Sequence, residues 1–570
     1  SMAMIFSLFI AFIVTPWASK RLIGKNVKEH AEHHDGFFSK IFRKIMSWIV
    51  DRPRNSIMVG VVVVVMLLGS MSLVGTKHVK VKMLPFDNKS EFQVLIDMPP
   101  GSTLKDTEKL ARDMSAKLYS YKEVKDIQVY VGTAAPFNFS GMVKHTFMRA
   151  NSYRADLQVN LLSKHERDIQ SHPLVTQIRN DIMNEFEKVK GLEIKFLEIP
   201  PGPPVMSTLL GEIYHPDLKI EEEATKKLAD IYRSTDGVVE TDTTYDQPQK
   251  KVCYDFDREK GMIHGVPQKY AAATMLMGLG DLNLFPLHID NEEESVFMRM
   301  SLSDNVKKND AALLSLLVPS MEGDKLPLSK VLKVENRESE NPIYHKDLKK
   351  VSYVMAEVAG AEESPFYAIQ KMSDKLTDFD VTYTDLPHSI TKPVLKWDGE
   401  MDITIEVFRD MGIAFLIAVI FILIIVIGWY NSFVLPLIII VPIPLTLIGI
   451  IPGHWMVGAF FTATSMIGFI AGAGITVRNS IILVDFIEMK RAEGLSPKDA
   501  VIESTIVRFR PILLTALAVL VAGVVILFDP IFQGLAISLM AGSIISAMLS
   551  IPLVPVLYYW LRKDKQTVQR

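Results

Sequence analysis

The sequence predicts an α-helical membrane bundle that carries a large α+β region outside the membrane. Two observations support this fold class. The chain contains charge-free apolar runs long enough to cross a bilayer, and the remaining sequence alternates between strand and helix patterns. A net charge of −3 argues against a nucleic-acid partner. The single Cys253 excludes a disulfide framework and a cysteine-based zinc site, and no other metal site is predicted.

The chain opens on an apolar run over residues 1–16, which is too short to span a membrane and is followed by Lys20 and Arg21. A signal peptide carries its positive charges before the apolar core. We therefore interpret this run as a truncated transmembrane helix and expect further sequence before it. Residues 17–54 then form a cytoplasmic loop, within which residues 37–50 have the pattern of an amphipathic helix.

A spanning helix needs about 20 mostly apolar residues. Residues 55–75 contain one such span, and residues 405–562 contain five more. The apolar run over 512–560 is too long for one helix, and the Asp529-Pro530 pair divides it into two. The six predicted spans are 57–74, 411–430, 433–451, 457–484, 512–528 and 531–560.

Basic residues predict the orientation of the bundle. Nine Lys or Arg lie between residues 20 and 54, which places this segment in the cytoplasm by the positive-inside rule. Counting crossings then puts residues 75–410 on the outside and returns the basic segments 490–510 and 563–570 to the cytoplasm. The three basic segments agree on one topology.

The region between the first two complete spans contains four βαβ patterns, over residues 92–131, 157–197, 208–241 and 351–384. Two consecutive units of this kind make a ferredoxin-like split βαβ domain. Residues 76–200 therefore form one such domain. Residues 201–247 and 349–390 form a second, which is interrupted by an insertion over 248–348. The proline-rich stretch at 199–204 links the two domains.

The order of these elements resembles the C-terminal half of a resistance-nodulation-division (RND) efflux transporter of the acriflavine-resistance type. Several strings carry the resemblance along the whole chain. They are AFIVTP (11–16), MLPFDNKSEFQVLIDMPPGST (83–103), ITVRNSIILVDF (475–486), RFRPILLTAL (508–517) and IPLVPVLYY (551–559).

The resemblance implies a proton-driven exporter of small amphiphilic or hydrophobic molecules, and not an enzyme. It implies that the two ferredoxin-like domains are porter subdomains and that residues 248–348 are a docking subdomain. It also implies a homotrimer in the bacterial inner membrane, in contact with lipids, with residues 75–410 in the periplasm. Its partners would be its own N-terminal half, a periplasmic adaptor (membrane fusion protein) and an outer-membrane channel. The sequence has no phosphate-binding GxxxxGK[ST] motif, and no cofactor is expected.

Arg478 is a charge inside an otherwise apolar run, which by default marks a functional position. Asp485 lies two turns further along the same face and Asn479 lies beside the arginine, so we expect an interior polar stripe. The alternative is that Arg478 extends to the cytoplasmic surface. The resemblance implies that Arg478 replaces a lysine that pairs with acidic residues of the N-terminal half. Arginine is never deprotonated in proteins, so Arg478 could act as a counter-ion but not as a proton carrier.

Arg508 and Thr515 lie seven residues apart at the predicted start of the next span. They match polar positions along the proton path of the family. The alternative is that Arg508 anchors the cytoplasmic end and that the Thr515 hydroxyl bonds to its own backbone.

Residues 132–142 (GTAAPFNFSGM) match the family's loop between two substrate pockets. Phe137, Phe139 and Met142 are the candidate substrate-binding residues, since exposed aromatic rings can contact apolar drugs.

Two other functions remain open. The chain has 28 methionines, and thioether sulfur is a ligand for Cu(I), so a copper or silver exporter would need paired methionines in the pocket between the porter subdomains. A non-transporting assembly or translocation subunit would lack the acidic pair in the N-terminal half.

Overall fold

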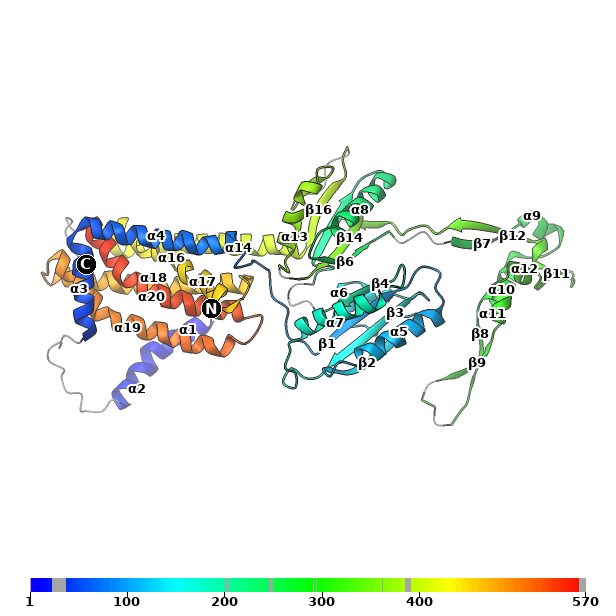
Figure 1. Ribbon diagram of the computed structural model, residues 1–570, viewed down its shortest axis with the longest axis horizontal. Coiled ribbons are helices and arrows are strands. Elements are labelled where there is room, and N and C mark those ends of the chain that lie inside the picture. The colour runs from blue at the N-terminus through cyan, green and yellow to red at the C-terminus, as the bar shows by residue number, and fades with distance from the viewer. Residues whose placement is uncertain are drawn as a thin grey trace. The chain divides into compact units, whose positions relative to one another are not determined.

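A computed structural model of the chain describes residues 2–22, 37–199, 202, 204–245, 250–290, 292–293, 295–360, 362–384 and 391–562 (Figure 1). The predicted tail 563–570 and residues 200, 201 and 203 of the predicted linker lie outside the described residues. The chain divides into two compact units. One unit contains Ser1–Asn88, Pro200–Pro203 and Ile403–Arg570, and the other contains Lys89–Ile199 and Pro204–Asp402.

The first unit is helical, and its described part contains six helical segments long and apolar enough to cross a membrane, as the sequence predicts. The segment Val434–Val457 is broken into three short helices, because Pro442 and Pro444 interrupt the backbone hydrogen bonds. The six segments are α4 (Pro53–Gly75), α14 (Glu400–Tyr430), the series α15 (Val434–Ile440), α16 (Pro442–Leu445) and α17 (Leu447–Val457), and then α18 (Ala463–Ala492), α19 (Pro497–Ile526) and α20 (Gln533–Arg562).

Small residues allow these helices to pack closely. A Cβ added to Gly449 of α17 would lie 2.6 Å from the carbonyl oxygen of Ala541 in α20. A Cβ added to Gly468 of α18 would lie 2.6 Å from the Cβ of Ser538, also in α20. Close approach increases van der Waals contact between the helices. This packing drives helix association in lipid, where no hydrophobic driving force acts between helices.

Several predicted span boundaries differ from the helix ends, and two helix starts show the reason. Helix α18 begins at Ala463 and not at 457, because the Thr462 hydroxyl accepts a hydrogen bond from the Ser465 backbone N–H in a capping box. Helix α19 begins at Pro497 and not at 512, because Ser496 caps it in the same way and a polar stretch continues the helix beyond the apolar run. The predicted break at Asp529-Pro530 is confirmed, since α19 ends at Ile526 and α20 begins at Gln533.

The N-terminal helix is longer than predicted. It comprises α1 (Met2–Phe9), a π-helical turn η1 (Ile10–Val14) and α2 (Thr15–Leu22), so the predicted end at residue 16 is wrong. Pro16 lies in the first turn of α2, directly after the wider π turn, where its missing N–H is tolerated. Helix α3 (Phe37–Asp51) occupies the position of the predicted amphipathic helix.

The second unit begins with a four-stranded antiparallel sheet in the order β2-β3-β1-β4. Helices α5 and α7 pack on it and enclose a core that includes Phe92, Met114, Leu157 and Ile178 (Figure 1). The Thr103 and Asp106 side chains form a capping box that begins α5. The elements are β1 (Glu91–Asp97), α5 (Leu104–Leu118), β2 (Val124–Val131), α6 (Phe139–Val143), η2 (Thr146–Met148), β3 (Arg154–Leu161), α7 (Ser171–Phe186) and β4 (Glu193–Leu197).

The next sheet of this unit has the order β13-β14-β5-β16-β15, with β6 also paired to β14. Its central strand pairs with Val394–Gly399, so the boundary predicted at residue 390 is wrong and this part extends to 399. The elements are β5 (Leu209–Tyr214), α8 (Leu218–Arg233), β6 (Val238–Thr243), β13 (Tyr344–Lys346), β14 (Lys349–Val358), α13 (Pro365–Met372), η4 (Ser373–Lys375), β15 (Asp380–Thr382) and β16 (Val394–Gly399).

The predicted insertion forms a separate set of short elements between β6 and β13. Strand β7 (Lys250–Phe256) pairs with β12 (Leu332–Glu338), and a small core that includes Val318 and Leu328 lies beside them. The other elements are α9 (Arg258–Ile263), α10 (Gln268–Leu279), β8 (Leu282–Leu287), β9 (Val296–Met300), α11 (Asp304–Lys307), α12 (Asp310–Leu314), β10 (Leu317–Pro319), β11 (Lys325–Pro327) and η3 (Leu328–Lys330).

Candidate functional site

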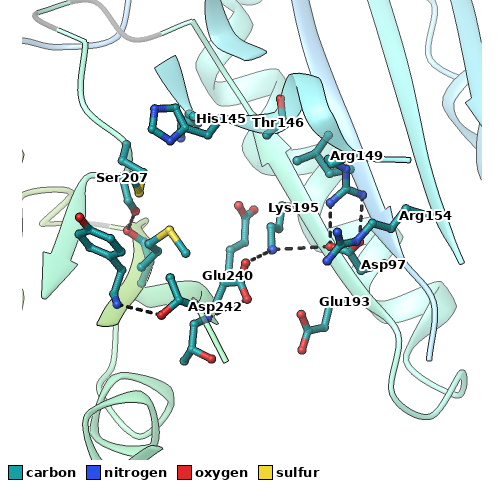
Figure 2. A pocket seen from close by; sticks show the side chains of 18 of the residues that line it. Asp97, His145, Thr146, Arg149, Arg154, Glu193, Lys195, Ser207, Glu240 and Asp242 are labelled. Carbon is teal, nitrogen blue, oxygen red and sulfur yellow. Dashed lines mark hydrogen bonds and ion pairs between the residues drawn. The ribbon is translucent and has the colours of Figure 1, made fainter. Parts of the chain in front are cut away.

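A cleft of about 560 Å³ lies in the second unit, between the β2-β3-β1-β4 sheet and the sheet that contains β5. Strands β1 and β4 and the segment after α6 line one wall, and strands β6 and β14 line the other (Figure 2). Charged side chains dominate both walls. They are Asp97, Lys144, Arg149, Arg154, Glu193, Lys195, Arg233, Glu240, Asp242 and Glu357.

Asp97, at the end of β1, organises the first wall. The Arg149 guanidinium binds its carboxylate with two nitrogens, at 2.9 and 3.0 Å, and Arg154 Nε donates a hydrogen bond to Oδ1 at 3.0 Å. Burial works to raise the pKa of Asp97, but the positive charges of Arg149 and Lys195 outweigh it, so the pKa lies below its ordinary value. Asp97 therefore stays ionised.

Among the described residues, four ion pairs join the two parts of the second unit that flank the cleft, and their charges are segregated. Every cation comes from the β2-β3-β1-β4 part and every anion from the β5 part, so the two walls attract each other. The pairs are Lys144–Glu357 (2.5 Å), His172–Glu363 (3.3 Å), Arg179–Glu240 (2.7 Å) and Lys195–Asp242. These pairs connect the two parts of the second unit that flank the cleft.

The environment of the paired groups changes their pKa values. Burial alone would lower the pKa of His172, but hydrogen bonds to Glu198 and Glu363 raise it to about 9. Burial raises the pKa of Glu240, and Arg179 only partly opposes this. Burial would also raise the pKa of Glu357, but Lys144 and Thr208 lower it below its ordinary value.

Two carboxylates in the cleft have unused acceptor oxygens. Oε2 of Glu240 has no well-aligned hydrogen-bond partner among the described residues, and the side chain is 4% exposed, although the Phe196 backbone N–H and Arg179 both stabilise this carboxylate. Glu193 is exposed at the cleft and forms no hydrogen bond or ion pair with any residue that the structure describes. Glu193 lies directly opposite Asp97 in the β1–β4 register, which places two like charges on neighbouring strands.

Phe137, Phe139 and Met142 do not line this cleft. They are exposed on and beside α6, and Phe137 packs edge-on against Phe147 with ring centres 5.7 Å apart. The same short segment continues into His145 and Thr146, which do line the cleft.

The cleft also contains three methionines, Met98, Met206 and Met355. They come from the end of β1, the segment before β5, and β14. Sequence reasoning named methionines in this pocket as the condition for a metal exporter, but it could not identify these three, because their positions in the chain are far apart.

In the first unit, Arg478 lies at the centre of α18 but does not point into the interior of this chain. Its side chain is exposed and forms no hydrogen bond or ion pair with any residue in the described ranges, whereas Asn479 is buried and Asp485 is half-buried. Within the described part of this chain, Arg478 is therefore not part of an interior stripe, and the predicted stripe stays a prediction. The buried polar face of α18 instead contains Thr476, whose hydroxyl lies 2.7 Å from that of Ser546 in α20.

Arg508 lies well inside α19 and not at its start. Its guanidinium carbon lies 4.5 Å from the ring centre of Phe486 in α18, and its buried Nε has no hydrogen-bond partner among the described residues. Thr515 donates a hydrogen bond to the Ile512 carbonyl at 2.7 Å, as the backbone alternative predicted. Arg508 and Arg478 are not brought together by any described contact.

Sequence reasoning missed two buried polar groups in the helices. His454 of α17 lies 2.8 Å from the Ser465 hydroxyl of α18. Glu488 of α18 accepts a hydrogen bond at 2.6 Å from the Tyr558 hydroxyl of α20, to which Arg491 also donates at 2.9 Å. A histidine and a glutamate beside long apolar runs were the available signals.

The model of the AcrB/AcrD/AcrF family matches residues 1–562 of the chain. The swarming motility protein SwrC of Bacillus subtilis (strain 168) is 23% identical over 572 residues, which cover 98% of this chain and 51% of SwrC. The cobalt-zinc-cadmium resistance protein CzcA of Cupriavidus metallidurans is 23% identical over 393 residues, which cover 67% of this chain and 36% of CzcA.

Among solved structures, a heavy metal efflux pump (crystal form II) is similar in fold, with a TM-score of 0.74 and 18% sequence identity. The alignment covers 93% of this chain and 52% of that chain. This chain therefore spans about half the length of that pump and of SwrC, and a smaller share of CzcA.

Proposed function

The chain belongs to the AcrB/AcrD/AcrF family of RND efflux transporters, multi-pass proteins of the inner membrane, and from that premise we propose that it is the C-terminal half of a proton-driven pump for small molecules. Transporters of this family are secondary transporters and not enzymes. The observation that carries the proposal is Arg478, a permanent charge at the centre of an apolar helix and exposed on this chain. Such a charge needs a partner from another part of the protein.

The proposed partners of Arg478 are acidic residues of the N-terminal half. When those carboxylates take up protons, the ion pairs are lost and α18 is released to move. Arg478 serves as counter-ion only, because a guanidinium keeps its proton. In this proposal Asn479, Asp485, Arg508 and Thr515 line the proton path.

The second unit supplies the substrate route. Its two sheets would be ferredoxin-like porter subdomains, and residues 248–348 would be the docking subdomain. The segregated ion pairs support a cleft that opens and closes between the two porter subdomains. Phe137, Phe139 and Met142 would contact substrate beside the cleft. In the complete assembly this region would lie in the periplasm, where a homotrimer contacts an adaptor and an outer-membrane channel.

A substitution of Arg478 tests the proposal in cells that express the complete transporter. Arg478→Ala is expected to abolish efflux at unchanged expression, whereas Arg478→Lys keeps the positive charge and retains efflux. Arg510→Ala, which removes an exposed arginine of α19, serves as the control and should leave efflux intact. Normal efflux by Arg478→Ala would refute the proposal.

A second candidate function is the export of a soft metal ion such as Cu(I). Met98, Met206 and Met355 line the same cleft, and thioether sulfur is a ligand that Cu(I) prefers. Replacing Met355 with Leu keeps the size of the side chain but removes the sulfur. A loss of copper or silver tolerance in that variant would favour metal export, and unchanged tolerance on deleting the whole gene would exclude it.

A further inference from the structure

Helix α3 lies across the ends of the membrane helices in the first unit, where it packs on α4, α19 and α20 (Figure 1). Its buried face contains Met46, Ile49 and Val50, which are 0%, 4% and 1% exposed. The ring centres of Phe42 and Phe509 of α19 lie 4.2 Å apart. These contacts fix the rotation of α3 about its own axis, so the packing decides which side chains face outward.

A second apolar stripe of α3 faces away from the bundle. Ile41, Ile45 and Trp48 follow one another at helical spacing and are 37%, 43% and 49% exposed. Helix α4 begins almost directly after α3, and its early apolar residue Ile57 is 66% exposed. The stripe therefore lies beside the point where the exposed apolar surface of the spans begins. An apolar stripe in this position is typical of a helix that lies in the membrane interface.

The cations of α3 differ in their surroundings. Arg43 lies 3.7 Å from Glu503 of α19 and so points toward the bundle. Lys40 and Lys44 lie one turn apart, next to the outward stripe, and both are exposed. Neither lysine forms an ion pair or a hydrogen bond with any residue that the structure describes. Two positive charges beside an exposed apolar stripe suit a surface that offers negative charge above an apolar layer.

The sequence around α3 indicates which membrane surface this is. Nine Lys or Arg lie between residues 20 and 54, and the positive-inside rule places such a segment on the cytoplasmic side. The cytoplasmic leaflet carries anionic lipids, which attract basic segments beside the membrane. Trp48 supports the same position, because tryptophan is enriched at the level of the headgroups. Charge complementarity and the adjoining apolar surface of the spans therefore favour lipid over a second protein as the occupant of this face.

We propose that α3 is a binding surface for acidic phospholipids, in which Lys40 and Lys44 hold the headgroup phosphates while Ile41, Ile45 and Trp48 enter the apolar layer beneath them. The alkyl stems of the two lysines can extend along that layer and keep their ammonium groups at the phosphates. This inference goes beyond the proposed transport function and does not depend on it.

Tryptophan quenching by brominated lipids tests the inference on the complete transporter in lipid nanodiscs. Phosphatidylglycerol is anionic, whereas phosphatidylcholine has no net charge. Each lipid, brominated on its acyl chains, is added as a minor component to unlabelled phosphatidylcholine. Bromine quenches the fluorescence of a tryptophan that lies beside it. We expect stronger quenching by the brominated phosphatidylglycerol, and Trp48→Phe should reduce this excess because it removes the reporter and keeps an aromatic ring.

The variant Lys40→Gln/Lys44→Gln should lower the preference for phosphatidylglycerol by about tenfold, because each lysine near an anionic surface contributes up to about fivefold. High salt should lower the preference of the wild type in the same direction. Glutamine has a helix propensity close to that of lysine, so α3 should stay folded. The control is Lys188→Gln/Lys190→Gln, which removes two exposed lysines of the second unit and should leave the preference unchanged.

Equal quenching by the two lipids, an excess that Trp48→Phe leaves unchanged, or a preference that Lys40→Gln/Lys44→Gln retains would each overturn the inference. An equal fall in Lys188→Gln/Lys190→Gln would also overturn it, because the preference would then follow the net charge of the protein and not α3.

Discussion

The Arg179–Glu240 pair allows a quantitative test of how the two walls of the cleft hold together. The pair is 2.7 Å long, and its side chains are 10% and 4% exposed. The variant Arg179→Met keeps most of the apolar stem but leaves the Glu240 carboxylate buried without a cation. Breaking one partner of such a pair costs about 3 kcal/mol of folding free energy.

An exposed pair of the same length is the matched control. Arg112 and Glu108 of α5 are also 2.7 Å apart, but their side chains are 73% and 45% exposed. Water screens that pair, so Arg112→Met should cost less than about 0.5 kcal/mol. Urea-dependent proteolysis of the purified protein measures both free energies of unfolding.

The pH dependence of Arg179→Met is a second signature. Burial raises the pKa of Glu240 and Arg179 opposes this, so removing Arg179 raises the pKa further. The folded variant then binds this proton more readily than the unfolded chain does. Its stability must fall as the pH rises. The destabilisation should be small near pH 5 and large near pH 8.

The double variant Arg179→Met/Glu240→Gln removes the buried charge and should lose this pH dependence. Equal costs for Arg179→Met and Arg112→Met, or a cost for Arg179→Met that does not change with pH, would refute the reasoning.

Three further predictions concern other parts of the chain. Gly534→Ala should cost about 1–3 kcal/mol of stability, because its Cβ would lie 2.2 Å from the Ser465 hydroxyl oxygen. Thermal unfolding measures this loss. The control Gly412→Ala should show no comparable loss, because the structure leaves open space at that position. His172 has a raised pKa of about 9, so the stability that it contributes is complete below its ordinary pKa and is lost as the pH rises through about 9. In pH-dependent unfolding, His172→Gln should abolish this loss. A loss that persists in the variant would contradict the assignment. Thr103→Ala removes the capping box of α5 and should cost about 1 kcal/mol, measured by urea unfolding, whereas an unchanged stability would show that tertiary contacts alone hold the helix start.

Helix ends show where sequence patterns were insufficient. An apolar run marks the part of a helix that lies in lipid, but the helix itself continues for as long as capping and backbone hydrogen bonds allow. For this reason α19 starts at Pro497, and Arg508 lies inside a helix that the hydropathy pattern begins only at 512. The capping residues Ser496 and Thr462 are visible in the sequence and indicate both helix starts.

Strand β16 shows the same limit for sheets. Val394–Gly399 is a short segment directly before α14 that mixes apolar residues with Lys396 and Asp398. It pairs with the nearby β15 and also with β5, about 180 residues earlier. The partner of such a strand depends on which elements pack together in the folded protein. The alternation of apolar and polar residues within one segment does not identify that partner.

The sequence by itself determined the six membrane segments, the alternating strand and helix pattern outside them, and the unusual charge at Arg478. These features depend on local length and hydrophobicity, which do not require knowledge of neighbours. Only the tertiary structure decided which side of α18 is buried, and it left Arg478 exposed while Thr476 faces Ser546. It also brought Glu193 opposite Asp97 and gathered every cation on one wall and every anion on the other at the paired positions. The physical reason is that charge pairing is a property of surfaces in contact, and these surfaces come from segments far apart in the chain.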